Sequence, residues 1–477
     1  MEIKIENKLE NILVLPIFKE KKKINFFNNK LNSKIKKEIF EKIKLFNFQG
    51  EENEICYFNI DKTKILLIGI KKNYSLENLR RAYSIVFKTL KEKKEFKYSI
   101  EIPKEKEEEI IAIVEGLDLT NYKFDKYISK KEKKKKTIIS IINIDKKFKK
   151  NIIETQIINK EIKFARNLIN ENSDIITPEK IEILVKEFAK ENKLKIKTLN
   201  EKQIQKEKLN LLNAVSKGSS LPPRLIIVEY TPNKNDKNIL ALIGKGITFD
   251  TGGINLKPTG YLEDMKSDMG GAASVFGIFK SIVNLKIKKN LILVIATAEN
   301  AISSTAYKPG DVLISYNNTS VEIGNTDAEG RLILADAISY VQKNYKPTHL
   351  IDIATLTGAC LVALGPSLIG MLGNNDEMKE NIFLSGEKTF ERVWELPIYN
   401  EHREMIKSKI ADIKNIGGKY GGVITAAAFL EKFIENKTPW VHLDIAGAGR
   451  SEKEEYYISE FGTGKSIRLI VDYIKSN

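Results

Sequence analysis

The order of strand-like and helix-like segments after residue 179 constrains the fold of this chain most strongly. Short apolar runs rich in Val, Ile and Leu alternate there with longer segments of helical periodicity. Such alternation is typical of a mostly parallel sheet covered by helices. The expected elements are a helix at 179–192, strands at 224–230 and 239–243, a helix at 271–283, a strand at 291–297, a helix at 331–344 and a strand at 349–354.

The first third of the chain predicts a second α/β unit. Strands are expected at 12–15, 64–70, 98–102 and 138–144, and helices at 76–91 and 107–117. A length of 477 residues exceeds that of an ordinary single domain, and 42% hydrophobic residues are enough for packed cores. We therefore predict an N-terminal domain at 1–148, a connecting helix at 149–172 and a larger domain at 173–477.

The segment 325–332, NTDAEGRL, concentrates charged side chains in a short space. It places Asp327 and Glu329 two positions apart, with Arg331 two positions further on. In an extended segment alternate side chains point the same way, so these three are predicted to converge. Two carboxylates held close together repel each other unless a cation neutralises them. The motif therefore indicates a metal ion, and a metal held by carboxylates suggests hydrolysis.

A second glycine-rich segment, GKGITFDTGG at 244–253, follows the apolar run 239–243. Ligands of open α/β sheets bind at the carboxyl ends of strands, and glycines let a ligand or backbone approach closely. Lys245 and Asp250 lie in this segment, and Lys257 and Asp268 follow it. These residues are candidates for the same site as the NTDAEGRL motif.

The four candidate acids, Asp250, Asp268, Asp327 and Glu329, carry a total charge of −4, which two divalent cations would neutralise. The ligands are hard oxygens with no Cys or His nearby, which favours Mg, Mn or oxygen-bound Zn. The alternative is that each acid is an ordinary turn or capping residue. The number of acids and the cationic residues around them favour the metal site.

These motifs have a close parallel in a known family. The chain resembles the leucyl (cytosol) aminopeptidase family of dinuclear metallopeptidases. The resemblance is carried by NTDAEGRL and GKGITFDTGG, with further blocks SDMGGAA at 267–273, IDIATLTGAC at 351–360 and WVHLDIAG at 440–447. It covers residues from about 150 to 477 well and the N-terminal third weakly.

The resemblance implies a ligand set. One metal ion would be bound by Lys245, Asp250, Asp268 and Glu329. The other would be bound by Asp250, Asp327 and Glu329 and by the Asp327 carbonyl, so that Asp250 and Glu329 bridge. A lysine ligates only as a neutral amine, so the pKa of Lys245 must be strongly lowered. Mn or Zn is expected, with Mg or Co as alternatives.

The resemblance also implies the reaction. The expected activity is a cytosolic aminopeptidase that releases Leu and other apolar N-terminal residues from peptides with a free amine, by two-metal hydrolysis of the first peptide bond. Lys257 would help to polarise the scissile carbonyl, and Arg331 would hold a small anion such as bicarbonate as a proton shuttle. Met265 is a candidate for the side-chain pocket, with an ordinary core methionine as the alternative.

Two architectural expectations come from the same resemblance. The N-terminal domain is expected to be an α/β, macro-domain-like unit, followed by a catalytic α/β domain with a mixed, mostly parallel sheet. The assembly is expected to be a homo-oligomer, a hexamer.

The net charge of +16 leaves open a role of another class, DNA binding, to which the lysine run at 130–136 would contribute. A lysine excess that accompanies abundant Ile and Asn favours instead a solvated surface. The two distant cysteines, Cys56 and Cys360, cannot make a disulfide framework, which favours a reducing cytosol. The longest apolar stretch, 290–298, is too short to span a membrane, so no membrane partner is expected.

Overall fold

The computed structural model describes residues 1–6, 9–21, 23–27, 31–130 and 135–477. Four of the seven residues in the lysine run at 130–136 therefore lie outside the described residues. The chain divides into two compact units. The first comprises Met1–Lys160 with Lys453–Glu460, and the second comprises Glu161–Glu452 with Phe461–Asn477.

The first unit is built on a mixed sheet with helices on both faces. Over the described residues seven strands pair in the order β1-β7-β6-β2-β5-β4, with β3 added to β2. The strands are β1 (Glu2–Ile5), β2 (Ile12–Glu20), β3 (Lys23–Phe26), β4 (Ile55–Ile60), β5 (Thr63–Gly69), β6 (Lys97–Ile100) and β7 (Ile138–Ile141). The helices are α1 (Ser33–Leu45), α2 (Leu76–Glu92) and α3 (Glu107–Thr120).

The central strand β2 shows why this sheet is covered on both sides. Ile12 and Val14 belong to the core beneath α2 and α3, whereas Leu13, Leu15 and Ile17 belong to the core that includes α1. Alternate side chains of a strand point to opposite faces, so an uninterrupted apolar strand needs two cores.

Helix α4 (Lys149–Asn170) contains the division between the units, which falls between residues 160 and 161. The predicted connecting helix extended to residue 172, two residues beyond the observed end. The predicted domain boundaries at 148 and 172 stay a prediction. The short segment Lys453–Glu460, which groups with the first unit, had no counterpart in the sequence-based division.

The second unit contains the larger sheet, whose order is β16-β15-β18-β14-β10-β11-β9-β8 over the described residues. Its strands are β8 (Lys195–Leu199), β9 (Arg224–Tyr230), β10 (Ile239–Asp250), β11 (Asn290–Asn300), β14 (His349–Ala354), β15 (Ile369–Gly373), β16 (Val393–Glu395) and β18 (Trp440–Asp444). Four neighbouring pairs are parallel and three are antiparallel, which confirms the mixed, mostly parallel sheet.

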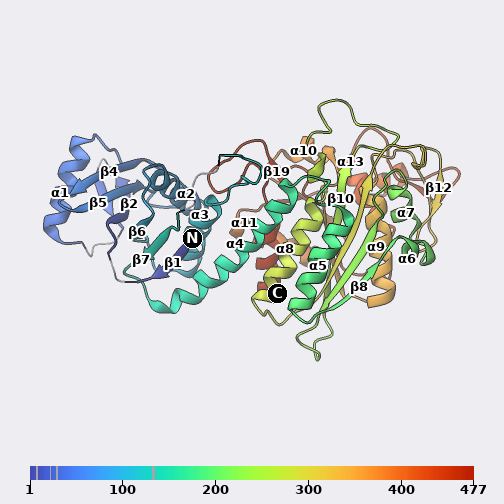
Figure 1. The fold of residues 1–477 in the computed structure, drawn as a ribbon, viewed down its shortest axis with the longest axis horizontal. Coiled ribbons are helices and arrows are strands. Elements are labelled where there is room, and N and C mark those ends of the chain that lie inside the picture. Colours follow the sequence, from blue (N-terminus) through green and yellow to red (C-terminus); the bar gives the residue numbers. More distant parts are fainter. Residues whose placement is uncertain (7–8, 22, 28–30, 131–134) are drawn as a thin grey trace. The chain divides into compact units, whose positions relative to one another are not determined.

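Helices cover both faces of this sheet (Figure 1). Ala241 and Ile243 of β10 pack in one core with residues of α9, whereas Gly244 lies against α8 on the other face. The helices are α5 (Pro178–Glu191), α6 (Glu201–Lys206), α7 (Asn210–Ser216), α8 (Gly270–Asn284), α9 (Gly330–Tyr345), α10 (Gly358–Leu364), α11 (Asp376–Thr389), α12 (Asn400–Met405), α13 (Gly422–Glu431) and α14 (Ile467–Ser476).

Short strands complete the second unit. They are β12 (Val312–Ile314), β13 (Ser320–Glu322), β17 (Ile413–Lys414), β19 (Arg450–Ser451) and β20 (Phe461–Gly462). Each strand and helix expected from the sequence has a counterpart, but β2 continues to Glu20 and β10 to Asp250, well past their predicted ends at residues 15 and 243. Among the described residues, none of the helices is both long enough and apolar enough to cross a bilayer.

Candidate metal centre

The central strand β10 carries two of the predicted site residues. The sequence pattern ended this strand at Ile243, but pairing continues to Asp250, so Lys245 and Asp250 lie within it rather than beyond it. Lys245 is only 3% exposed and Asp250 only 2%. The pairing with β11 shifts register between Ile247 and Asp250, and such an irregularity re-aims the side chains around it.

The NTDAEGRL segment is not extended, and the geometric reason given for its convergence is wrong. Thr326 and Asp327 lie in a turn, and α9 begins at Gly330. Glu329 is the residue before the helix and has helical backbone angles. A turn followed by a helix start still brings Asp327 and Glu329 together, but it sends Arg331 in another direction.

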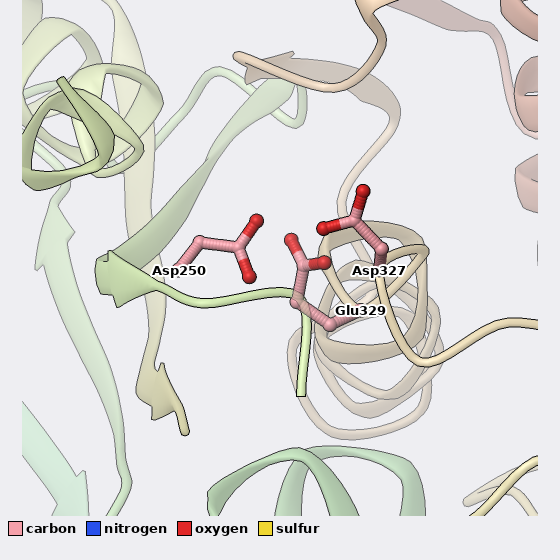
Figure 2. A group of neighbouring side chains, drawn as sticks. All are labelled: Asp250, Asp327 and Glu329. Carbon is pink, nitrogen blue, oxygen red and sulfur yellow. The ribbon is translucent and has the colours of Figure 1, made fainter. Parts of the chain in front are cut away.

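Three carboxylates from two segments meet at one point. A carboxylate oxygen from each of Asp250, Asp327 and Glu329 lies within 4.8 Å of the others. Figure 2 shows Asp250 pointing from the end of β10 toward Glu329, with Asp327 beside it. Glu329 is 2% exposed, whereas the Asp327 side chain is 33% exposed. The cluster is therefore buried on one side and open on the other.

Lys245 joins the fourth predicted acid to this cluster. Its Nζ lies 2.8 Å from Asp268 Oδ2 and 2.9 Å from Glu329 Oε1, and it donates to the Thr355 carbonyl at 2.9 Å. Gly330 leaves room for it, because a Cβ at that position would lie only 2.6 Å from Lys245 Cε. The glycine of NTDAEGRL thus leaves space for the lysine of GKGITFDTGG in its present position.

Lys257 lies on the open side of the cluster. Its Nζ is 2.8 Å from Asp250 Oδ2 and 2.6 Å from Asp327 Oδ1. Gly252 belongs to the loop that runs from Asp250 to Lys257. Its φ of +86° is in the left-handed region, and a Cβ there would lie 2.9 Å from Asp327 Oδ1. The predicted lysine thus contacts two of the predicted acids.

The negative charge of the clustered carboxylates exceeds the positive charge of the two lysines that contact them. Burial raises the pKa of Asp250 to about 6, and Glu329 adds to the rise while Lys257 opposes it. Burial also raises the pKa of Asp268 and that of Asp327, each reinforced by the negative charge of Glu329. For Glu329 burial acts in the same direction, but Lys245 and Lys257 outweigh it and lower the pKa.

This electrostatic imbalance fits a cation site. Four acids face two ammonium groups, which leaves a charge of −2 when all are ionised. Glu329 Oε2 is buried and has no hydrogen-bond partner among the described residues. A buried acceptor without a donor is costly, and a divalent cation would satisfy it.

The protein's own charges raise the pKa of Lys245. Burial disfavours its ammonium form, but Asp268, Glu329 and Asp250 outweigh that effect. The lowered pKa that ligation requires would have to come from bound cations, and it stays a prediction.

Arg331 lies apart from the carboxylates. It is buried, Nη1 donates to the Asn415 carbonyl at 2.7 Å, and Nε has no hydrogen-bond partner among the described residues. Burial lowers its pKa to about 10, against the opposing charges of Glu329 and Asp444. A buried guanidinium with an unused donor fits a small anion.

The remaining predicted residue, Met265, begins a short 3₁₀ turn, η2 (Met265–Ser267), and is partly buried. Asp268 follows this turn and is held by Thr355, whose Oγ1 donates to Asp268 Oδ1 at 2.7 Å. The contacts neither assign Met265 to a substrate pocket nor place it in the core clusters.

Several polar residues around the site were missed in the sequence. Asn300 donates to Asp250, Tyr307 donates to the Thr326 carbonyl, and Asn415 accepts from Arg331 through its carbonyl. Asp444 accepts from Leu356 N and Thr357 Oγ1, next to the Thr355 carbonyl that Lys245 contacts. Asn300 and Asp444 had a local signal, since each ends an apolar strand.

Comparison with known proteins agrees with this geometry. The sequence profile of the cytosol aminopeptidase family, catalytic domain, matches residues 163–471, and that of its N-terminal domain matches residues 14–131. The chain belongs to the cytosol aminopeptidase family.

Relatives extend over most of the chain. A protein of Protochlamydia amoebophila named "Probable cytosol aminopeptidase" is 39% identical over 443 residues, which is 90% of this chain and 89% of that protein. One of the same name from Aquifex aeolicus is 41% identical over 439 residues, again 90% and 89% of the two chains. Membership supports an aminopeptidase, a peptide hydrolase, as the activity of this chain.

A solved structure has the same fold over nearly the whole chain. The "Bottromycin maturation enzyme BotP in complex with Mn" superposes with a TM-score of 0.86 over 98% of this chain and 99% of that one. The two sequences are 24% identical, so this comparison concerns the fold alone.

Proposed function

We propose that this member of the cytosol aminopeptidase family releases N-terminal amino acids, with Leu and other apolar residues preferred, by two-metal hydrolysis of the first peptide bond. The observation that carries the proposal is the meeting of Asp250, Asp327 and Glu329 at one point, with Asp268 linked to them through Lys245. Carboxylates crowded in this way favour a pair of divalent ions.

The proposed ligands follow from the family resemblance and are compatible with the contacts. Lys245, Asp250, Asp268 and Glu329 would hold one ion. Asp250, Asp327 and Glu329 would hold the other, with the Asp327 carbonyl. When bound, two such ions supply Lewis acidity that activates water and polarises a carbonyl. Mn or Zn is the proposed metal, with Mg and Co as alternatives.

The chain's own residues have separate roles in the proposal. Lys257, whose ammonium group lies at the open edge of the cluster, would stabilise negative charge on the scissile carbonyl oxygen. Arg331, with its unused Nε, would hold a small anion such as bicarbonate that carries a proton. Met265, partly exposed ahead of Asp268, would contact the first side chain of the peptide.

The test compares a Leu-containing peptide with the same peptide acetylated at its amine. We expect release of Leu from the free peptide, loss of activity on chelation, and recovery when Mn, Zn, Mg or Co is added back. Acetylation should abolish cleavage, because the free amine is expected to bind beside the metals. Equal cleavage of both peptides would disprove the proposed substrate binding.

Three wider proposals rest on the family rather than on the geometry. They are a hexameric assembly, a cytoplasmic location and a macro-domain-like N-terminal domain. The DNA-binding alternative stays untested. The relatives are named as aminopeptidases, and most of the lysine run at 130–136 that motivated this alternative lies outside the described residues.

A further inference from the structure

Asn300 is a buried amide between the two segments that supply the carboxylates. It is the last residue of β11, has no solvent exposure, and pairs with Asp250 beyond the shift in register. Its backbone carbonyl accepts from Thr251 N at 2.9 Å and from Thr251 Oγ1 at 3.0 Å. The residue is thus anchored by its main chain while its side chain faces the site.

The Asn300 side chain joins the two segments. Nδ2 donates to Asp250 Oδ1 at 2.8 Å and to the Thr326 carbonyl at 3.1 Å. Both partners are acceptors, so only the NH₂ end of the amide can face them. Thr326 directly precedes Asp327, and its carbonyl also accepts from Tyr307 Oη at 2.8 Å. One amide therefore fixes Asp250 and the start of the NTDAEGRL turn in a common frame.

The consequence for Asp250 is a division of its two oxygens. Oδ1 accepts from Asn300 and also from Gly252 N at 2.9 Å, so both of its in-plane lone pairs are committed. Oδ2 lies 2.8 Å from Lys257 Nζ, which also contacts Oδ1 of Asp327 in the carboxylate cluster. Oδ2 is therefore the oxygen that Asp250 would offer to a cation, and the rotation of the carboxylate that presents Oδ2 depends on the donors to Oδ1.

We propose that Asn300 is the positioning residue that orients Asp250 toward the metal ions and holds the Asp327 turn at the matching distance. The inference rests on the proposed function, since it concerns the same cation site. Groups that orient a ligating carboxylate typically change metal affinity 10- to 100-fold when they are removed. Asn300 acts through Asp250 and contacts neither substrate nor reacting atoms in this scheme.

The same strand offers a matched control at its other end. Asn290, the first residue of β11, is also buried, and its Nδ2 also donates to two carbonyls, those of Asn233 and Asp236, at 2.8 Å each. Its partners belong to a turn with none of the predicted site residues. Asn290 Oδ1 also accepts from Asn233 N at 3.2 Å, so Asn290→Ala removes three side-chain hydrogen bonds, at least as many as Asn300→Ala, without touching the cluster.

The experiment measures Mn²⁺ binding to metal-stripped full-length protein by titration calorimetry. We expect Asn300→Ala to weaken Mn²⁺ binding about 10- to 100-fold. Asn290→Ala should leave the Mn²⁺ affinity within about twofold of the wild type, while it lowers Tm by about as much as Asn300→Ala does. In kinetics at saturating Mn²⁺, kcat should fall more than KM rises in the Asn300 variant. If Asn300→Ala does not fold, Asn300→Ser, which keeps a donor too short to reach both acceptors, takes its place.

The outcomes separate the inference from the function. Equal Mn²⁺ affinity in wild type and the Asn300 variants would overturn the positioning role while leaving the proposed function intact. Equal loss in the Asn290 and Asn300 variants would overturn it too, because the effect would then be general stability. Failure of the wild type to bind Mn²⁺ or to cleave the free peptide would instead overturn the proposed function.

Discussion

Each unit of this protein contains a buried cluster of charged side chains, and the two clusters differ in their balance. In the first unit, Arg80 Nε lies 2.5 Å from Glu115 Oε2, and Arg80 Nη1 lies 3.7 Å from Glu77 Oε2. Arg81 Nε lies 2.8 Å from Glu77 Oε1. Tyr457 adds a hydrogen bond to Glu77. In these contacts between described residues, two guanidinium groups face two carboxylates.

In the second unit the four acids face two cationic side chains among the described residues, Lys245 and Lys257. The excess charge is −2, and Glu329 Oε2 lacks a hydrogen-bond partner among the described residues. Unbalanced buried charge is costly unless something compensates it. In the first cluster, side chains of the protein itself balance the buried negative charge. The second cluster keeps an excess of negative charge and is therefore suited to bind added cations.

The strongest test of this difference is Glu329→Gln, which keeps the shape and removes one charge. Because Glu329 is assigned to both ions, we expect loss of bound metal and a fall in kcat/KM of roughly 10⁴-fold, about 5.5 kcal/mol. Elemental analysis and steady-state kinetics measure the two effects. Retention of two metal ions per chain would show that the bridging assignment is wrong.

The reverse test removes a charge from the balanced cluster. Arg80→Met removes the guanidinium that Glu77 and Glu115 share, while Arg81 still pairs with Glu77. Because a buried ion pair then loses one of its members, the free energy of unfolding should fall by about 3–5 kcal/mol. Urea denaturation measures this change, and Mn²⁺ affinity should stay unaltered. Lys88→Met is the control, since its pair with Glu454 is largely exposed and should contribute less than about 1 kcal/mol. Weakened Mn²⁺ binding in Arg80→Met would break the proposed distinction.

A smaller effect is expected when a positive group leaves the second cluster. Lys257→Met should lower kcat by about 10²- to 10³-fold through lost stabilisation of the oxyanion. Mn²⁺ affinity should be equal to that of the wild type or higher, because the ammonium no longer competes for Asp250 and Asp327. Calorimetry and kinetics on the same preparation decide this, and a loss of metal would make Lys257 a structural support instead.

The smallest effect concerns a buried acid that the chain satisfies without any cation. Asp336, in α9, accepts from the backbone N–H groups of Leu211, Leu212 and Tyr316 at 2.8–3.0 Å. Burial nevertheless raises its pKa to about 7. The native state then binds the proton more tightly than the unfolded chain, so this group's contribution to stability falls as pH rises from about 4 to about 7.

Asp336→Asn should remove this pH dependence and cost about 1–3 kcal/mol through the bond lost to Tyr316. The measurement is the unfolding free energy of variant and wild type between pH 4 and 7, with Mn²⁺ affinity as the control. Parallel pH profiles for the two proteins would show that Asp336 is ionised throughout this range.

Much of the fold was predictable because periodicity and apolar runs are local properties. Strand β9 and strand β14 have the predicted ends, and α8 and α9 are each within one residue of theirs. The end of β10 was not predictable, because its glycines resemble a loop while its pairing with β11 continues to Asp250. Hydrogen bonding to a neighbour, which sequence does not display, decided where that strand stops.

The sequence alone determined which chemistry was available: the four acids, the two lysines and the arginine, together with the glycines that let them approach. The tertiary structure decided which of them meet, since it bent NTDAEGRL into a turn, separated Arg331 from the carboxylates and placed Asn300 against Asp250. The physical reason is that residue types fix charge and hydrogen-bonding capacity, whereas distances between separate segments depend on strand register and packing.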